Sequence, residues 1–585
     1  MTRAGASLLE RIRLASRRFL LATQVVIGIL CGLSAFAFHS LVEEIRLVLI
    51  SPALQQSLIL RTVLVIVIPS AGAFWIAVAI RRFAPGAGGA NLARVRRAYG
   101  QDPGLLDARS IAATFLLTPI SLGSGAPLGP EGPIVVVASG LSSGLARFLR
   151  LPRKVARGMI PVGTAAGIAA IFNAPITGVV FALEEVLGTA EKGVLGGAIV
   201  AAVAAAVVER SLLGGKPILA APSATWSDGR ELLGFAILGV LAGSAAGLTI
   251  RAIERLKKIL DRKVPDAALR GGIAGALIGV LALFSPSILG VGYETVSSWL
   301  NGGGGLASSA LAFGAKSAGY VLALAAGMIG GTFAPSLFMG AALGSTVGHS
   351  MKLIFPALAI DPKAYALVGM GAFFAGVLRC PIAAVLIVVE VTGDYGLILP
   401  LMLAVSLAIG LSRRVSKFNV VERQLREEGF GGERTLDPLS DMKVADLMTD
   451  KVVTVGTDMT ILDAARALAG HRHQYYPAID GEGNLAGVVE AEAIDERARD
   501  GDIDARISDL CQKPEVVATK DMPVTDLVRR MGQRGLTRCP VTAGNGSNRL
   551  VGFVSPSDLL RARIRSLDET WVDGAADSSR RGQKG

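Results

Sequence analysis

The sequence Gly129-Pro130-Glu131-Gly132-Pro133 places a single acid inside a long apolar region of the chain. Glu131 is the only ionisable side chain between Ser110 and Ala146. A charge near the middle of a bilayer costs about 2.5 to 3.5 kcal/mol on insertion scales, so a carboxylate kept there indicates a functional site. The alternative is a carboxylate at the membrane surface that caps the N-terminus of a helix.

The glycines and prolines on both sides of Glu131 predict a helix that is broken at this depth. A helix end inside the protein directs unpaired backbone N–H groups and the positive end of its dipole inward. Because such an end readily binds an anion, the stretch predicts an anion site beside a buried acid.

A second copy of this spacing of glycine and proline, Gly331-Thr332-Phe333-Ala334-Pro335, begins 202 residues after the first. The run Asn173-Ala174-Pro175 is repeated by Arg379-Cys380-Pro381 at an offset of 206, and a glutamate follows each proline by nine residues, at Glu184 and Glu390. Two landmarks at nearly one offset predict an internal duplication, and interrupted hydrophobic segments at matching places indicate the binding site of a transporter. Chance similarity among helices rich in glycine and alanine is the alternative.

The composition predicts a chain that lies mostly in lipid. Hydrophobic residues make up 51% of the 585 residues, and the mean hydropathy is +0.52. The 71 glycines and the low aromatic content of 5% suit closely packed helices that touch through small residues. Uncharged runs long enough to span a bilayer cover residues 20–38, 62–80, 158–183, 232–250, 271–293 and 317–348.

The net charge of +12 comes from basic clusters in the connections between these runs. Lysines and arginines concentrated in connecting loops are typical of the cytoplasmic face of a membrane protein. The pattern therefore predicts no nucleic-acid partner, and it predicts cytoplasmic N- and C-termini with an even number of crossings. The clusters lie at residues 11–18, 81–97, 147–157 and 251–263.

Several other function classes fit the sequence less well. Cys31, Cys380, Cys511 and Cys539 lack the spacing of a metal site or a disulfide, and the four histidines form no metal motif, so we expect core thiols and no metal. A membrane-embedded enzyme is disfavoured because no histidine, cysteine or paired aspartate accompanies Glu131. A cation transporter would need acidic or carbonyl-rich ligands where this chain has glycine-rich helix ends. A nucleotide-sensing receptor without transport stays open from the C-terminal part alone.

Glu185 is the second acid of interest, because it follows Glu184 at the end of a long uncharged stretch. Burial favours the protonated form of a carboxylate, which allows it to take up and release protons near neutral pH. If Glu131 lies mid-membrane and the Glu184-Glu185 pair lies nearer the cytoplasm, we expect a proton to be transferred between the two sites. The alternative is an ordinary helix terminus at the lipid headgroups.

The chain divides into a membrane part and a soluble part. We expect a basic cytoplasmic N-terminus at 1–18, a transmembrane domain at 19–430 with repeats at about 19–210 and 230–430, and a linker at 431–442. The polar segment 443–565 contains two copies of a strand and helix pattern, which predicts a small α/β layer. Residues 566–585 form a polar tail that we expect to be disordered.

These motifs resemble the chloride channel and chloride/proton exchanger (CLC) family, with a C-terminal pair of CBS domains. Residues 129–133 look like its G-(K/R/P)-E-G-P signature, residues 331–335 match its G-x-F-x-P, and residues 172–185 match the helix with the internal glutamate of exchangers. The resemblance covers residues from about 19 to 565. It implies an all-α polytopic membrane fold of two inverted repeats with broken, tilted helices, followed by a small α/β CBS pair.

Carried over position by position, the resemblance makes Glu131 the gating carboxylate, which occupies the anion pathway when it is ionised. Glu185 takes the role of the internal proton relay. The backbone amides of Thr332 and Phe333 would hold the central anion, with Gly132 and Ala90 as the remaining anion-binding positions.

Two positions depart from the family pattern. Ala90 stands where the family's serine loop aligns with residues 89–93, so the hydroxyl that contacts the central anion is missing. Val421 aligns with the tyrosine of the family's last helix, and Pro130 lacks an N–H. Losing two neutral donors, each worth about 0.5 to 1.5 kcal/mol, would weaken the selectivity of the central site while leaving its backbone donors in place.

The resemblance implies a secondary active anion transporter, and chloride/proton antiport regulated by a cytoplasmic CBS pair is the leading interpretation. A passive, voltage-gated chloride channel is the first alternative. An antiporter of fluoride or another anion is the second, because Asn91 is reminiscent of the fluoride-exporting branch, whereas Pro133 and Glu185 look like the chloride/proton type. The implied partners are the anion, protons, the lipid of the plasma or inner membrane, and a second copy of the chain in a homodimer with one pathway per subunit.

The second half of the CBS pair resembles an adenine nucleotide site. In the stretch 552–558, the family pattern would have Ser555 touch phosphate and Asp558 the ribose hydroxyls. The matching stretch 487–493 has neither the hydroxyl nor the aspartate. At most one nucleotide site is therefore expected, no other cofactor is required, and a purely structural dimerisation module is the alternative.

Overall fold

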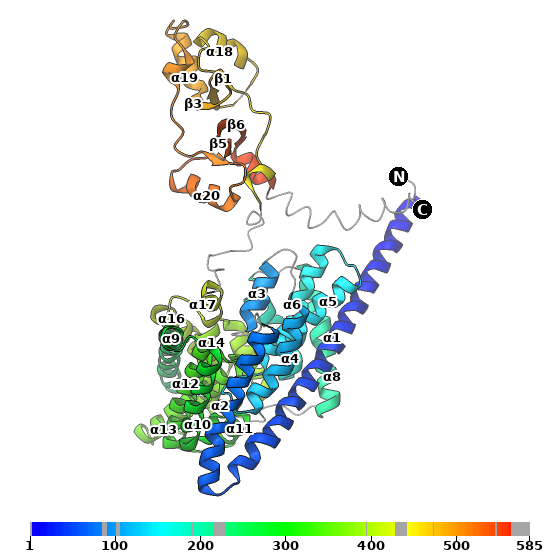
Figure 1. The fold of residues 1–585 in the computed structure, drawn as a ribbon, viewed down its shortest axis with the longest axis vertical. Helices are drawn as coiled ribbons and strands as arrows, with labels where there is room; N and C mark the ends of the chain where they lie inside the picture. Colours follow the sequence, from blue (N-terminus) through cyan, green and yellow to red (C-terminus); the bar gives the residue numbers. More distant parts are fainter. Residues whose placement is uncertain are drawn as a thin grey trace. The chain divides into compact units, whose positions relative to one another are not determined.

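The chain forms two units in a computed structural model, residues 1–432 and residues 433–585, and each is described by itself (Figure 1). The structure describes residues 3–84, 91–100, 106–188, 192–214, 219, 226, 228–393, 395–427, 442–471, 473–544 and 547–562. Most of the expected linker and all of the expected C-terminal tail therefore lie outside the described residues.

The first unit is helical throughout its described residues, and eight of its helices are long and apolar enough to cross a membrane. The helices of its first half are α1 (Arg3–Leu54), α2 (Leu58–Phe83), α3 (Asn91–Gly100), α4 (Ala108–Gly123), α5 (Glu131–Phe148), α6 (Arg153–Phe172), α7 (Pro175–Phe181), the π-helical η1 (Ala182–Leu187) and α8 (Lys192–Leu213). The second half contains α9 (Glu231–Lys263), α10 (Ala267–Phe284), the short η2 (Pro286–Ile288), α11 (Tyr293–Leu300), α12 (Leu306–Ala326), α13 (Phe333–Ile354), α14 (Pro362–Leu378), α15 (Pro381–Thr392), α16 (Ile398–Val415) and α17 (Val420–Glu427).

The first helix is longer than the sequence predicted. The charges of Glu43, Glu44 and Arg46 interrupt the apolar run in the sequence and predict a helix end near residues 43–46, but α1 continues to Leu54. Glu43 and Arg46 lie one turn apart on the same helix face and form an ion pair of 2.7 Å. Because this pair neutralises its own charges, the helix continues through it.

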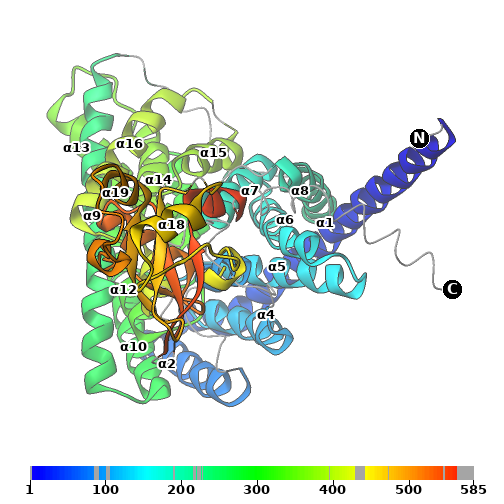
Figure 2. The same cartoon turned by 90° about the horizontal axis from the view of Figure 1, so that it is seen from above.

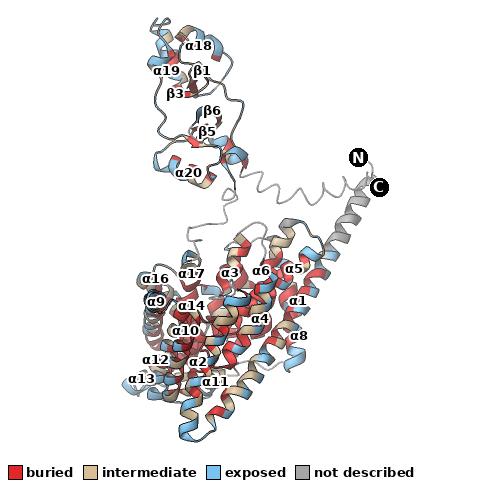
Figure 3. Cartoon of the chain, in the orientation of Figure 1, coloured by how far each residue is buried: buried red, intermediate tan, exposed pale blue. Residues whose placement is uncertain are grey.

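The two halves of the membrane unit lie on opposite sides of the bundle. Figure 2 shows α4, α5, α6 and α8 on one side and α9, α10, α12, α13, α14 and α16 on the other. Helix α2 belongs to the first half of the unit but packs against α10 of the second. The short helices α7 and α15, which begin at the two repeated prolines, contact each other between the groups. The buried positions of this unit concentrate where helices face one another (Figure 3).

Glycine explains how closely these helices approach. A Cβ atom on Gly340 of α13 would lie 2.3 Å from the carbonyl oxygen of Gly369 on α14, and one on Gly369 would lie 2.3 Å from the carbonyl oxygen of Gly340. On the α9 and α16 pair, a Cβ on Gly243 would lie 2.3 Å from the carbonyl oxygen of Ala408. Only glycine permits this contact between backbones, as the high glycine content predicted.

The second unit contains two small sheets with the same topology. In the first, β1 (Val455–Gly456) pairs parallel with β2 (Tyr475–Ile479), which pairs antiparallel with β3 (Leu485–Glu490). In the second, β4 (Ala518–Thr519), β5 (Cys539–Gly544) and β6 (Ser547–Val554) repeat this order. Helices and turns cover the sheets, namely η3 (Val444–Asp446), α18 (Ile461–Leu468), α19 (Ala491–Arg499), η4 (Ile507–Leu510) and α20 (Val524–Gln533). The four cysteines of the chain are free thiols, and all except Cys511 are buried.

Candidate functional site

The two glycine motifs meet at one point of the membrane unit. Gly129 donates to the carbonyl oxygen of Gly331 over 3.0 Å, and Gly331 donates back to the carbonyl oxygen of Gly129 over 2.6 Å. A Cβ on Gly331 would lie 2.7 Å from the nitrogen of Gly132, so only glycine allows the two backbones to come this close. Helices α5 and α13 both begin two residues beyond this bridge, at Glu131 and Phe333.

Glu131 is fully buried beside the bridge. Its Oε1 accepts a hydrogen bond of 2.9 Å from the hydroxyl of Tyr293, whereas Oε2 has no hydrogen-bond partner among the described residues. The carboxylate folds back against Gly129, where a Cβ would lie only 2.1 Å from Oε2. The first glycine of the motif is therefore needed for this side-chain position as well as for the backbone bridge.

A small cavity lies between the first turns of α5 and α13. The unpaired N–H groups and the positive dipole ends of two helices meet beside it, an arrangement that favours an anion without supplying a full positive charge. The predicted positions Gly132, Thr332 and Phe333 all line this cavity together with Glu131. The complete lining consists of Leu92, Glu131, Gly132, Val135, Ile168, Phe181, Gly331, Thr332 and Phe333.

Ala90 is the fourth predicted anion-binding position, and Val421 is the residue that aligns with the family's tyrosine. Ala90 lies outside the described residues. Val421 is buried in α17 and is not one of the residues that line the cavity. The side of the cavity near Phe333 is aromatic instead, because the ring of Phe333 lies 5.3, 4.8 and 4.4 Å from those of Phe172, Phe181 and Phe374.

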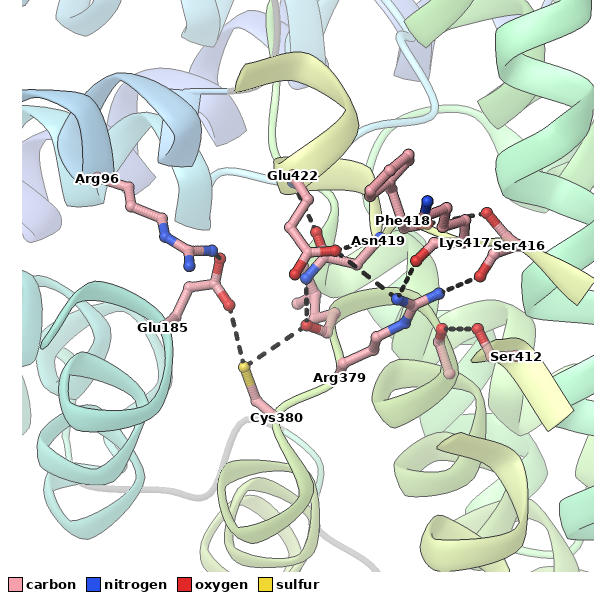
Figure 4. A network of polar contacts seen from close by, with 12 residues as sticks. Arg96, Glu185, Arg379, Cys380, Ser412, Ser416, Lys417, Phe418, Asn419 and Glu422 are labelled. Atoms are coloured by element: carbon pink, nitrogen blue, oxygen red, sulfur yellow. Dashed lines mark hydrogen bonds and ion pairs between the residues drawn. The ribbon is translucent and has the colours of Figure 1, made fainter. Parts of the chain in front are cut away.

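Glu185 lies in the π-helical segment η1 and is 4% exposed. Its Oε1 lies 3.5 Å from Nη1 of Arg96 on α3, and its Oε2 accepts a contact of 3.3 Å from the thiol of Cys380 (Figure 4). The sequence did not predict either partner, because they come from two other helical segments far along the chain. A π-helical turn is often found at functional sites, since it redirects side chains that an α-helix would space evenly.

Glu184 has a different environment from its neighbour. Its carboxylate accepts hydrogen bonds of 3.1 and 2.9 Å from the backbone N–H groups of Ile382 and Ala383, at the start of α15. The duplicated Glu390 does the reverse and accepts bonds of 2.9 and 2.6 Å from the N–H groups of residues 176 and 177, at the start of α7. Glu184 therefore caps a helix of the other repeat, whereas Glu185, with which the sequence hypothesis groups it as one proton site, does not.

A polar network surrounds the start of α15 and includes Arg379, whose φ of 62° places it in the left-handed region. Its guanidinium donates to the carbonyl oxygens of Ser416 and Lys417 over 2.5 and 3.0 Å and lies 3.7 Å from Glu422 on α17. Asn419 donates to the carbonyl oxygen of Leu378 over 3.0 Å. Figure 4 shows that this network ties the segment next to Cys380 to the last helices of the membrane unit.

Sequence reasoning also missed Lys316, a fully buried lysine on α12. Its ammonium donates to the carbonyl oxygens of Ile288, Gly290 and Val291 over 2.9, 2.6 and 3.3 Å. The only signal in the sequence is that Lys316 immediately precedes the long uncharged run that begins at residue 317.

In the second unit, Ser555 and Asp558, the two residues expected to bind a nucleotide, form hydrogen bonds with each other. The N–H and hydroxyl of Ser555 donate to Oδ2 of Asp558 over 2.8 and 2.6 Å, and Thr449 donates to Oδ1 over 3.0 Å, with Arg561 also in contact. Burial opposes the ionisation of Asp558, but the donors, led by Ser555, hold its pKa below the ordinary value. The bond from the Ser555 N–H to the acid three residues later is one half of a capping box at the start of the following helix, whereas the Ser555 hydroxyl donates to the same acid.

Comparisons with solved structures show the fold. The chain is similar to a slow cyanobacterial Cl⁻/H⁺ antiporter with a TM-score of 0.65 and 24% identity, over 71% of this chain and 99% of the other. It is similar to a eukaryotic CLC transporter with a TM-score of 0.64 and 20% identity, over 94% of this chain and 98% of the other. A CLC-type fluoride/proton antiporter matches with a TM-score of 0.58 and 22% identity, over 69% and 97%.

Comparisons of sequence agree with this fold. The chain is 36% identical over 305 residues to a putative ClcB-like chloride channel protein of Ralstonia nicotianae, covering 52% of this chain and 71% of that protein. It is 32% identical over 334 residues to an H(+)/Cl(-) exchange transporter ClcA of Vibrio cholerae, covering 55% and 71%. The model of the CBS domain matches residues 444–498 and 507–565. Because the model of the voltage gated chloride channel matches residues 72–413, more than half of the chain, this protein belongs to the voltage-gated chloride channel (CLC) family and carries a C-terminal pair of CBS domains.

Proposed function

We propose that this chain is a secondary active transporter that exchanges chloride for protons. The carrying observation is the fully buried carboxylate of Glu131 where the first turns of α5 and α13 meet beside a cavity. The name of the Vibrio cholerae relative, an H(+)/Cl(-) exchange transporter, supports the same choice. A second buried acid, Glu185, distinguishes an exchanger from a passive pathway, because coupling needs a way for the proton to reach the other side.

In the proposed mechanism, the ionised carboxylate of Glu131 competes with the anion for the helix N-termini at Gly132 and Phe333. Both negative groups are stabilised by the same N–H groups and dipole ends, so they exclude each other there. Protonation removes the charge of Glu131, weakens its hold on the site and lets an anion enter. Glu185, beside Arg96, passes the proton to or from the cytoplasm. Each cycle thus links one protonation of Glu131 to the movement of anions.

Anion and proton flux measured together in liposomes tests this function. The purified full-length chain is reconstituted, chloride, nitrate and fluoride gradients are imposed in turn, and the pH inside the vesicles is recorded. Proton movement driven by a chloride gradient supports the proposal. Chloride flux without proton movement indicates a passive channel, and coupled movement restricted to fluoride indicates the fluoride exchanger, which the lost hydroxyl at Ala90 leaves chemically open.

We also propose the membrane setting that the basic clusters indicate. The chain is a multi-pass protein of the plasma or inner membrane with cytoplasmic termini, a transmembrane domain at 19–430 in two repeats, a linker at 431–442 and a CBS pair at 443–565. It acts as a homodimer with one pathway per subunit, and exposed apolar side chains on α7, α15 and α16 provide a surface for a second copy. These are Ile176, Ile382, Leu399 and Met402. Cross-linking in membranes and labelling of engineered cysteines from each side test these assignments.

The CBS pair is proposed to bind one adenine nucleotide at Ser555 and Asp558. Because Asp558 already accepts hydrogen bonds from Ser555 and Thr449, a ribose must displace or share these donors. Equilibrium dialysis of the full chain with labelled ATP and AMP tests the site. Binding that is lost in Asp558→Ala and kept in Asp463→Ala, a change in the first CBS half, supports the nucleotide site. The absence of binding by the unaltered chain supports the structural alternative, and equal binding by both variants overturns the assignment of the site to Asp558.

A further inference from the structure

Tyr293 is the side chain that holds the carboxylate of Glu131 in its observed position. The hydroxyl of Tyr293, the first residue of α11, donates to Oε1 over 2.9 Å. Within the described part of the chain, Oε2 accepts no hydrogen bond and lies against Gly129. Tyr293, from the second repeat, is therefore the side-chain donor to this carboxylate, which also lies near the backbone N–H groups of Glu131 and Ala334. The family motifs quoted above do not include this tyrosine.

The place of Tyr293 is set in turn by a buried cation. The turn that precedes α11 directs the carbonyl oxygens of Ile288, Gly290 and Val291 at the ammonium of Lys316, with distances of 2.6 to 3.3 Å. Gly290 has a φ of 62°, in the left-handed region that glycine adopts without strain. A buried ammonium without such acceptors would be strongly destabilised. The carbonyl oxygens of the turn therefore stabilise the ammonium of Lys316, and the ammonium in turn fixes the conformation of the turn.

Aromatic packing fixes the other side of the same assembly. The ammonium of Lys316 lies 4.8 Å from the centroid of the Phe338 ring, and Phe338 packs edge to face against Trp299 of α11 at 5.2 Å. A Cβ on Gly292, directly before Tyr293, would lie 2.7 Å from the Phe338 ring. Gly292 has a φ of 87° and lets the chain turn into α11 against this ring. The position of Tyr293 is thus fixed by tight packing of the preceding turn and of α11 against Phe338.

We propose that Tyr293 is a positioning residue of the gate, whose hydroxyl holds the ionised carboxylate of Glu131 in place, and that Lys316 sets the position of Tyr293 through the turn at residues 288–292. The inference rests on the proposed gating role of Glu131. Glu131 leaves this position when it is protonated, because the neutral acid attracts a hydroxyl donor less strongly than the ion does. Tyr293 therefore sets the proton concentration at which the pathway opens.

The variant Tyr293→Phe keeps the ring and removes only the donor. Among the described residues, the titratable groups that act on Glu131 are Tyr293 of α11 and Lys316 of α12, and Lys316 is unchanged in this variant. A hydrogen bond to a charged group corresponds to a factor of about ten to a hundred, so the external pH of half-maximal anion flux should rise by about one to two units. The measurement is chloride efflux from liposomes over a range of external pH.

Tyr320→Phe is the matched control for this change. Its hydroxyl is buried on α12 and has no hydrogen-bond partner among the described residues. The same loss of one oxygen should leave the pH profile where it is in the unaltered protein. A profile for Tyr293→Phe that coincides with that of the control overturns the role of Tyr293.

A double-mutant cycle tests the role of Lys316. Lys316→Met removes the donors to the turn, and Lys316→Gln, which retains an amide donor, is the second variant should the first fail to fold. If Lys316 acts mainly through Tyr293, either change shifts the pH profile by itself but adds only its smaller direct electrostatic effect in the Tyr293→Phe protein. Shifts that add in full in the double variant contradict this route and leave only a direct electrostatic effect on Glu131.

The failure of this inference differs from the failure of the proposed function. If the unaltered chain couples chloride to protons and Glu131→Ala removes the coupling, but Tyr293→Phe retains the original profile, the inference is overturned and the function stands. If the unaltered chain conducts chloride without protons, the exchange function fails, while the pH profile of the anion flux still decides the role of Tyr293.

Discussion

The two repeats of the membrane unit place different side chains at the same point. Glu131 and Phe333 are 202 residues apart, each follows a glycine of the Gly129 and Gly331 bridge by two residues, and each begins a helix, α5 or α13. The first repeat supplies a buried acid there and the second supplies an aromatic ring. The backbone geometry is shared, so the charge of Glu131 is not needed to form it.

At the second pair of repeated positions, the two repeats place the same kind of side chain in the same role. Glu184 and Glu390 are 206 residues apart, and each caps the short helix of the other repeat. The next residue of each pair differs, because Glu185 is matched by Val391. Among these repeated positions, the acids present in both copies cap helices, and Glu131 and Glu185, each matched by an apolar residue, are the candidates for function.

The largest effect is expected for Glu131→Ala, which removes the acid that lacks a counterpart in the second repeat. Proton movement coupled to a chloride gradient should be abolished while chloride flux persists, since the helix N-termini remain. The measurement is the liposome assay with a pH electrode. Glu254→Ala, a change on the exposed face of α9, is the control. Coupled proton movement at the original rate in Glu131→Ala would falsify the gating role.

Glu185→Gln should have the next largest effect. The amide cannot carry a proton, so proton transport should fall at least tenfold while chloride flux falls much less. The ratio of the two initial rates in liposomes is the measurement, and Glu184→Gln, the adjacent capping acid, is the comparison. An equal loss of both fluxes in Glu185→Gln would identify it as another structural acid.

Gly129→Ala should disturb the site without removing any polar group. Its Cβ would lie 2.1 Å from Oε2 of Glu131, so the carboxylate must leave its position against the bridge. We expect chloride flux that depends less on external pH than that of the unaltered protein. Gly144→Ala is the matched control, because a Cβ on this residue of α5 meets nothing within 4 Å. Identical pH profiles for the two alanine variants would contradict the observed position of Glu131.

Glu184→Gln and Glu390→Gln should have similar effects on stability, because the two acids are equivalent. Each change weakens hydrogen bonds from backbone N–H groups to a carboxylate, which corresponds to about 1 to 3 kcal/mol in the free energy of unfolding. Thermal unfolding in detergent measures the loss, and coupling of protons to chloride should be retained. Glu254→Gln, which weakens only an ion pair on the surface of α9, should change stability by less than about 1 kcal/mol. A loss confined to one of the two capping acids would break the equivalence of the repeats.

The smallest effect concerns Asp558, a capping acid outside both repeats. Its pKa is held below the ordinary value, so its contribution to stability is present above the unfolded value of about 3.9 and is lost as pH falls through the folded value. The protection of residues 547–562 against hydrogen exchange in the full chain, taken relative to the intrinsic exchange rate at each pH, should therefore fall below about pH 4. In Asp558→Asn this acid dependence should be reduced. An unchanged dependence would show that other groups control the acid stability of this unit.

The sequence predicted the elements of the site better than their partners. The breaks at 129–133 and 331–335, the duplication and the association of both motifs follow from glycine, proline and one isolated acid, because these residues act locally on the backbone. The end of α1 was predicted wrongly, because the ion pair between Glu43 and Arg46 is a property of the folded helix. Tyr293 and Lys316 were missed, because an aromatic residue and a lysine at the edge of an apolar run have no distinctive local pattern.

By itself, the sequence determined that this protein is a duplicated, glycine-broken membrane chain with a buried acid, because hydropathy and helix breaking depend on nearest neighbours along the chain. Only the tertiary structure decided which acids face backbone N–H groups and which face another titratable side chain. Glu184 and Glu185 are adjacent in the sequence, yet one caps α15 and the other meets Arg96. The partners of a side chain inside a bundle come from distant helices, and packing rather than local sequence determines which helices meet.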